Sequence, residues 1–265
     1  MSVMRNVQKS AVLLALAFVA LGGSVVPSRA ADEPAVAAAA SLRYALDQIA
    51  ADFEEKTGTK VRITYGATGN LVQQIEKGAP FQVLLAADDG SVKKLAGESL
   101  TEGAPVVFAQ GQLSIVAAKG SPVAVDSELK GLGEALAAGT VKHFAIANPD
   151  VAPYGRAARE ALMKAGLWDK IQPLIVQGDN VGQAAQFTTT GAAEAGMIAH
   201  SLALSAEMAP KIAAAVVPES WHEPIDNGMA VIKGAGEPAR SFAAYVQGAE
   251  GRAVLEKNGF VVPAK

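Results

Sequence analysis

The sequence predicts an α/β fold arranged as two lobes. Short apolar strand patterns alternate with amphipathic helix patterns through most of residues 34–262, and this order predicts mostly parallel sheets with helices on both faces. Hydrophobic residues make up 50% of the chain and charged residues 18%, a globular composition. Residues 31–265 are more than one such layer usually holds, and no linker divides them. We therefore expect two lobes, with the chain crossing between them more than once.

The first half of the chain contains three strand patterns and three helix patterns. Strands are expected at residues 34–40, 61–65 and 83–86. The first helix has Ser41 as its expected N-cap and Gly58 as its stop. The second helix follows the turn at residues 66–70, and the third covers residues 91–98 with Asp88–Asp89 as its cap.

The second half repeats this order. Strands are expected at residues 113–117, 143–147, 174–176, 195–198, 213–217 and 229–232. Helices are expected at residues 156–165, 181–190, 238–248 and 251–258. A loop over residues 148–155 leads into the first of these helices.

Residues 1–30 have the pattern of a secretory signal peptide. Arg5 and Lys9 precede the apolar stretch Ala11–Gly22, and Ser28 to Ala30 supply small residues at the cleavage positions. The apolar stretch is too short to span a bilayer. We expect cleavage after Ala30 and export of the mature chain to the periplasm.

Composition excludes several classes of site and partner. The chain has no cysteine, and its histidines His143, His200 and His222 do not stand at metal-ligand spacing, so no cation site is expected. The first thirty residues hold three basic residues and no acidic one, which leaves 20 basic and 26 acidic residues and a net charge of −6. An acidic chain without basic blocks is not expected to bind nucleic acid.

Catalytic motifs are absent. The sequence contains no Walker A loop, no complete GxGxxG fingerprint and no GxSxG elbow. An exported serine hydrolase with Ser41 as nucleophile and His200 or His222 as base is an alternative, but a serine before a helix is more often a cap. We expect no enzymatic activity and no cofactor.

Small polar residues recur where a predicted strand leads into a helix. Ser41, Thr68, Tyr154 and the Asn180–Gly182 segment hold such positions, two in each half of the chain. Helix N-termini carry unpaired N–H groups and a partial positive charge, and ligands of parallel sheets bind beyond the carboxyl ends of the strands. Four such termini together predict an anion site between two lobes that requires no cationic side chain.

Several segments resemble the periplasmic molybdate-binding proteins of molybdate ABC transporters. The resemblance covers essentially the whole mature chain. It is carried by AAASL at residues 38–42, YGATGNL at 65–71, QIEKGAP at 74–80, LAAD at 85–88, the 148–162 segment, GDNV at 178–181 and Gly259–Phe260.

The resemblance implies a type II periplasmic binding protein with a ligand cleft between its lobes. Residues 31–112 and 219–265 would form lobe I, and residues 113–218 lobe II. Ser41 and Thr68 match the family's two hydroxyl ligands, and Tyr154 and Val181 match positions that present backbone N–H groups. Many members place a further tyrosine where this chain has Ala199, and the Tyr154 hydroxyl could take its place.

The implied function is the capture of molybdate, and of tungstate, for a membrane permease. Molybdate is a dianion that only accepts hydrogen bonds, so hydroxyl and backbone N–H donors suit it. Protonated phosphate would require an acceptor, for which only Asp150 and Asp179 are at hand in these loops. A receptor preferring sulfate or thiosulfate is the alternative among binding proteins. A monomer is expected.

Overall fold

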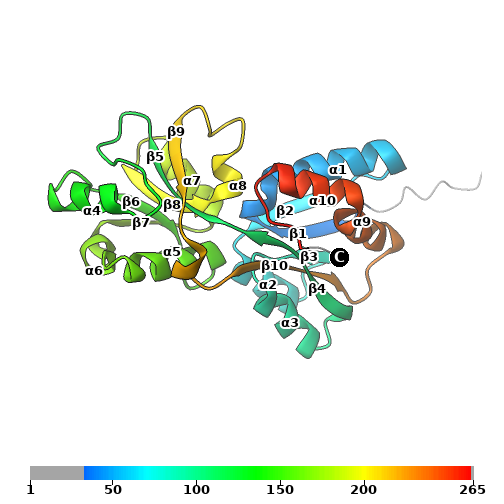
Figure 1. Ribbon diagram of the computed structural model, residues 1–265. Helices are drawn as coiled ribbons and strands as arrows, with labels where there is room; N and C mark the ends of the chain where they lie inside the picture. Colours follow the sequence, from blue (N-terminus) through cyan, green and yellow to red (C-terminus); the bar gives the residue numbers. More distant parts are fainter. Residues whose placement is uncertain (1–32, 264–265) are drawn as a thin grey trace, which may run out of the picture. The chain divides into compact units, whose positions relative to one another are not determined.

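The computed structural model describes residues 33–263 of the chain. The predicted signal peptide therefore lies outside the described residues. Within the described range, two five-stranded sheets carry the architecture, and each sheet is flanked by helices (Figure 1).

The first sheet has the strand order β2-β1-β3-β10-β4. Strand β1 pairs in parallel with β2 and with the central strand β3, whereas β10 pairs antiparallel with β3 and β4. The bounds are β1 Ala35–Ala39, β2 Arg62–Gly66, β3 Val83–Leu85, β4 Thr101–Gly111 and β10 Ile225–Ile232.

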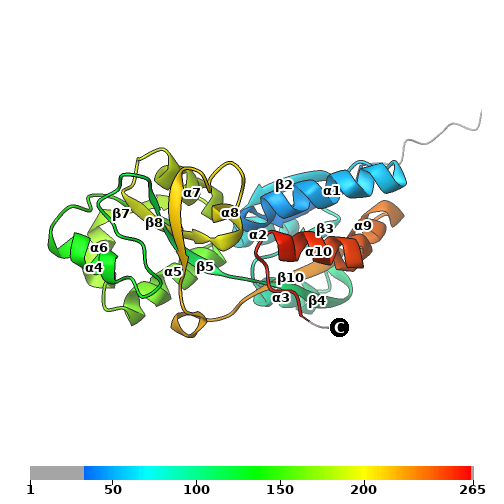
Figure 2. The same cartoon turned by 45° about the horizontal axis from the view of Figure 1, so that its top comes forward.

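Helices cover both faces of this sheet. One face is covered by α1, α9 and α10 and the other by α2 and α3 (Figures 1 and 2). Because side chains alternate along β1, Val36 and Ala38 belong to the larger core cluster and Ala37 to the cluster with α2 and α3. The bounds are α1 Arg43–Thr57, α2 Thr68–Glu76, α3 Asp89–Gly97, α9 Glu237–Gln247 and α10 Ala249–Lys257.

The second sheet repeats this plan with the order β7-β6-β8-β5-β9. Strand β6 pairs in parallel with β7 and β8, and β5 pairs antiparallel with β8 and β9. The strands are β5 Leu113–Ala118, β6 Phe144–Ala147, β7 Ile175–Gly178, β8 Ala195–Ala199 and β9 Ile212–Val216. The helices are α4 Lys130–Ala137, α5 Pro153–Lys164, α6 Trp168–Ile171, α7 Val181–Thr189 and α8 His200–Ala203.

The chain passes between the two sheets twice. Only Gln112 separates β4 from β5, and residues 217–224 lead from β9 back to β10. The two passages run beside each other, because Ile225 pairs with Gly111 (Figure 1). The expectation of more than one crossing is confirmed, whereas the lobe boundaries at residues 112 and 218 stay a prediction.

The sequence prediction of an α/β fold with two helix-flanked sheets is confirmed, but both sheets are mixed. Half of the strand pairings in each sheet are antiparallel, because β10 and β5 each enter their sheet after a passage from the other one. The sequence patterns did not predict helix α4 or strand β4. In β4, Gly103 and Pro105 are residue types that usually interrupt a strand.

The prediction that Ser41 is the N-cap of the first helix is wrong. Ser41 lies in a short 3-10 turn, Ala40–Leu42, ahead of α1, and its side chain does not cap that helix. The other two predicted helix signals are confirmed. Gly58 ends α1 with φ of 72°, and the Asp88 carboxylate accepts a hydrogen bond from the Ser91 N–H.

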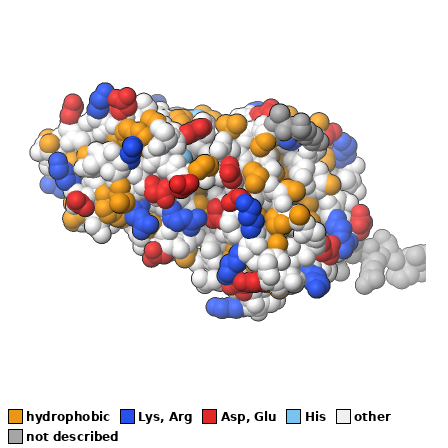
Figure 3. Space-filling model, turned by 60° about the horizontal axis from the view of Figure 1, so that its bottom comes forward, with side chains coloured by type: hydrophobic (Ala, Val, Ile, Leu, Met, Phe, Trp, Pro, Cys, Tyr) orange, Lys and Arg blue, Asp and Glu red, His pale blue; other side chains and the backbone are white. Residues whose placement is uncertain are grey.

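Acidic and basic side chains are interspersed on the face drawn in Figure 3, without a block of one sign. Within residues 33–263, no helix combines the length and the apolar character needed to cross a bilayer.

Candidate functional site: a small neutral cavity

The site is built from four helix starts that follow parallel strands. Ser41 follows β1, Thr68 follows β2, Tyr154 follows β6 and Val181 follows β7. In each place a strand ends and a helix, or at Ser41 a 3-10 turn leading into a helix, begins within a few residues. This arrangement brings the first N–H groups of the helices to the carboxyl ends of the strands.

All four of these residues line one small cavity. Its volume is about 10 Å³, and each of the four residues is at most 4% exposed. Ala87, which follows β3, also lines it. The structure thus brings together the four positions that the sequence singled out from both halves of the chain. A cavity of this volume has room for about one water molecule.

Two hydroxyl groups in this cavity have no hydrogen-bond partner. Neither the Ser41 Oγ nor the Tyr154 Oη is bonded to any atom of residues 33–263, although both atoms are buried. Burying an unpaired hydroxyl costs about 1–3 kcal/mol, so such groups point to a missing partner. The free energy of unfolding is therefore lower than a fully hydrogen-bonded core would give, and a hydrogen bond to a ligand oxygen could recover the difference.

Thr68 is oriented as a donor. Its Oγ1 accepts a hydrogen bond of 3.0 Å from the Ala87 N–H. Because a hydroxyl group has a single proton and that proton is not used in this bond, Thr68 can donate it toward the cavity. The Thr68 hydroxyl proton is therefore available to a ligand that accepts hydrogen bonds.

Backbone N–H groups supply further donors. The Asn180 side chain caps α7 by accepting from the N–H groups of Gly182 at 2.9 Å and Gln183 at 3.2 Å. The preceding N–H, that of Val181, makes no hydrogen bond within the described part of the chain. The N–H of Tyr154, in the first turn of α5 after Pro153, is unbonded within the same range.

No charged side chain lines the cavity. Its walls are alanine, glycine, proline and valine besides the hydroxyl-bearing residues. Asp88 and Arg156 line an adjacent cavity that shares Ala87 and Pro153 with this one, and they neutralise each other through a contact of 3.0 Å. Burial raises the pKa of the Tyr154 phenol, so Tyr154 stays protonated and able to donate.

Comparisons with known proteins identify the family. The family model described as "Bacterial extracellular solute-binding protein" matches residues 34–261. The chain belongs to this family. The molybdate-binding protein ModA of Azotobacter vinelandii is 37% identical over 91% of this chain and 95% of that protein. The ModA protein of Rhodobacter capsulatus is 33% identical over 90% and 92%.

A solved structure agrees with this family assignment. The periplasmic molybdate-binding protein of Azotobacter vinelandii superimposes with a TM-score of 0.79 at 33% identity. The match covers 88% of this chain and all of that one. The cavity described above therefore lies in a solute-binding fold.

This solute-binding protein does not assemble a serine–histidine pair at Ser41. The Nδ1 of His200 lies 3.0 Å from the Ser114 Oγ, and the Nδ1 of His222 contacts the Glu223 carbonyl. The Ser41 carbonyl instead accepts a hydrogen bond of 2.7 Å from the Ser201 hydroxyl. Within residues 33–263, neither His200 nor His222 is therefore hydrogen-bonded to Ser41.

Three further residues that the sequence singled out lie outside the cavity lining. Ala199 is buried at the start of α8 and does not line the cavity, nor do Asp150 and Asp179. Among residues 33–263, no group of three or more histidine or acidic side chains is placed to hold a metal ion.

The sequence missed the residues that support the site. Ala87 orients Thr68, Ser201 holds the Ser41 turn, and Arg156 neutralises Asp88 beside the cavity. Each of these acts through a contact between segments at least 19 residues apart, and no local pattern announces such contacts.

Proposed function

We propose that this protein is the substrate-binding component of a molybdate importer of the ABC class. It captures molybdate, and tungstate as well, in the periplasm and delivers the oxyanion to a membrane permease. Two relatives at 33% and 37% identity are named molybdate-binding proteins, and their matches cover at least 90% of this chain. The observation that carries the proposal is the neutral cavity, lined by donors from both sheets, with two unpaired buried hydroxyls.

The donor set fits a fully deprotonated oxyanion. Ser41, Thr68 and the N–H groups of Tyr154 and Val181 can all donate, and no carboxylate lines the cavity to accept a proton from the ligand. A hydrogen bond to a charged acceptor contributes about 1.5–3 kcal/mol. Several of them give tight binding after the entropy of association is subtracted. Phosphate, which keeps a proton at neutral pH, finds no carboxylate partner here.

Size separates molybdate from sulfate. Both are dianions, so the electrostatic attraction of the helix N-termini does not distinguish them. Sulfate has shorter bonds to oxygen, and backbone N–H groups cannot follow a smaller anion inward without moving whole helices. Because hydrogen bonds weaken as they lengthen, several contacts to sulfate would be lost together.

Calorimetry with molybdate, tungstate, sulfate and phosphate tests the proposal. Molybdate and tungstate should bind within about tenfold of each other, a difference of about 1.4 kcal/mol or less. Sulfate should bind at least roughly a thousandfold more weakly, and phosphate should not compete. Displacement of molybdate by equimolar sulfate would show that the cavity is not sized for the larger anion and would favour a sulfate receptor.

A further inference from the structure

Gly111 and Tyr154 fit together in a way that leaves no room for a side chain at position 111. Gly111 is the last residue of β4, directly before the passage at Gln112. A Cβ atom on Gly111 would overlap the Tyr154 hydroxyl oxygen and would lie 3.1 Å from Cζ of the same ring. The φ angle of Gly111 is not in the left-handed region, so close approach, and not backbone conformation, requires glycine here.

The hydroxyl that Gly111 admits has no use in the protein alone. Tyr154 is 2% exposed, and its Oη makes no hydrogen bond to any atom of the described residues. A phenylalanine would fill the same space without that cost. The same small cavity holds a second unpaired hydroxyl, that of Ser41, and both groups are donors in a neutral enclosure. Because a hydroxyl oxygen also accepts hydrogen bonds, these two groups could use at most one of their two protons between them, and at least one proton is left for an acceptor from outside the chain.

We propose that Gly111 is a positioning residue for oxyanion capture. By lacking a side chain, it lets the Tyr154 phenol extend to the cavity, where the hydroxyl donates a hydrogen bond to a ligand oxygen. Tyr154 thereby offers two donors, its N–H and its hydroxyl. This inference rests on the proposed function, because the acceptor it requires is the oxyanion.

Four proteins measured side by side with molybdate test the inference: the unmodified chain, Tyr154→Phe, Gly111→Ala and the double variant. Tyr154→Phe should lower the affinity about ten- to a hundredfold, the loss of one hydrogen bond to a charged acceptor. Its ligand-free Tm should stay equal or rise, because an unpaired buried hydroxyl is removed. If the Tyr154 hydroxyl only stabilised the fold, Tyr154→Phe would keep its affinity for molybdate and lose Tm.

Gly111→Ala should lower the molybdate affinity to a similar extent, since its methyl group displaces the phenol. In the Tyr154→Phe background, adding Gly111→Ala should change the affinity by less than about threefold, because the hydroxyl is already gone. Gly97→Ala, at a glycine of α3 with open space around it, and Tyr245→Phe, on α9, are matched controls that should bind normally.

Three outcomes would count against these ideas in distinguishable ways. If the unmodified protein does not bind molybdate, the proposed function itself fails. If it binds and Tyr154→Phe binds equally well, only the role of the phenol is overturned. If the losses from Gly111→Ala and Tyr154→Phe add in full, Gly111 does not act through the hydroxyl.

Discussion

Ser41 shows how a single residue can be found from sequence and still be misjudged in its local role. Its place after an apolar strand predicted both a helix cap and an anion ligand. The structure removes the first role, because the hydroxyl is buried without a partner and α1 is not capped by it. The pattern of strand, small polar residue and helix thus locates a candidate donor, but only the tertiary surroundings show whether the donor is already used.

At Ser41, we expect a substitution to have opposite effects on molybdate binding and on stability. Ser41→Ala should lower the molybdate affinity by about one to two decades, while the ligand-free Tm stays equal or rises slightly. Titration calorimetry and scanning calorimetry measure the two effects. Ser205→Ala is the matched control, because the Ser205 Oγ accepts the Met208 N–H and lies outside the cavity. That control should lose stability and keep its affinity, and the reverse result would refute the assignment of Ser41.

Elements were more predictable than their pairing. Helix and strand patterns located β1, β2, α2 and α7, because each has a clear apolar face and ends at a turn residue. Strand β4 was missed because its exposed edge position tolerates Gly103 and Pro105, which a central strand would exclude. The antiparallel entry of β10 depends on the long return from the other sheet, and a local pattern does not encode that.

Arg156 of α5 and Asp88 at the start of α3 form an ion pair beside the candidate site. We expect this pair to make molybdate binding depend on salt when Arg156 is replaced. Without Arg156, the Asp88 carboxylate would stand unpaired beside an anion cavity, at a cost on the order of 1 kcal/mol, or about fivefold in affinity. Arg156→Gln should therefore weaken molybdate binding at low salt and less so at high salt.

A second substitution separates charge from contact. Adding Asp88→Asn to Arg156→Gln removes the unpaired charge and keeps a good helix cap, so part of the affinity should return. Arg159→Gln on the same helix controls for net charge. A double variant that binds more weakly than Arg156→Gln would contradict this role.

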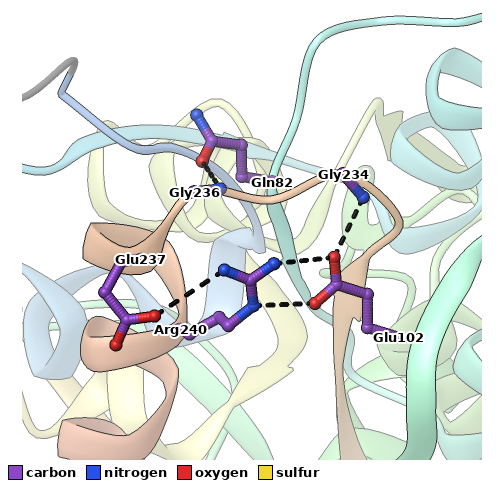
Figure 4. A network of polar contacts seen from close by, with 6 residues as sticks. All are labelled: Gln82, Glu102, Gly234, Gly236, Glu237 and Arg240. Atoms are coloured by element: carbon purple, nitrogen blue, oxygen red, sulfur yellow. Dashed lines mark hydrogen bonds and ion pairs between the residues drawn. The ribbon is translucent and has the colours of Figure 1, made fainter.

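The turn before α9 depends on a polar network in which Arg240 and Gly234 both bond to Glu102 (Figure 4). The Arg240 guanidinium holds the pKa of the Glu102 carboxyl below its usual value. Its contribution to stability is therefore present above the unfolded-state pKa and is lost as the pH falls through the lower folded-state value.

Glu102→Gln should consequently speed amide hydrogen exchange at Gly234 without changing molybdate affinity. The Gly236 amide, which Gln82 holds, serves as an internal reference. Unchanged exchange at Gly234 would show that this network does not hold the turn.

At the scale of the whole molecule, the donors come from both sheets, so bound molybdate should stabilise the entire fold. A ligand that binds only the folded state adds about 2.7 kcal/mol at one hundred times its Kd. The Tm should therefore rise with the logarithm of the molybdate concentration. Equal concentrations of sulfate should produce a much smaller rise, and equal rises with both anions would contradict the proposed size selection.

A crystal structure of the molybdate complex, with anomalous scattering recorded at the molybdenum edge, tests the proposed molybdate site most directly. We expect one strong anomalous peak in the cavity lined by Ser41, Thr68, Tyr154 and Val181, with ligand oxygens within hydrogen-bond distance of their hydroxyl or N–H groups. A peak elsewhere on the protein, or an ordered anion in this cavity that lacks those contacts, would contradict this proposal.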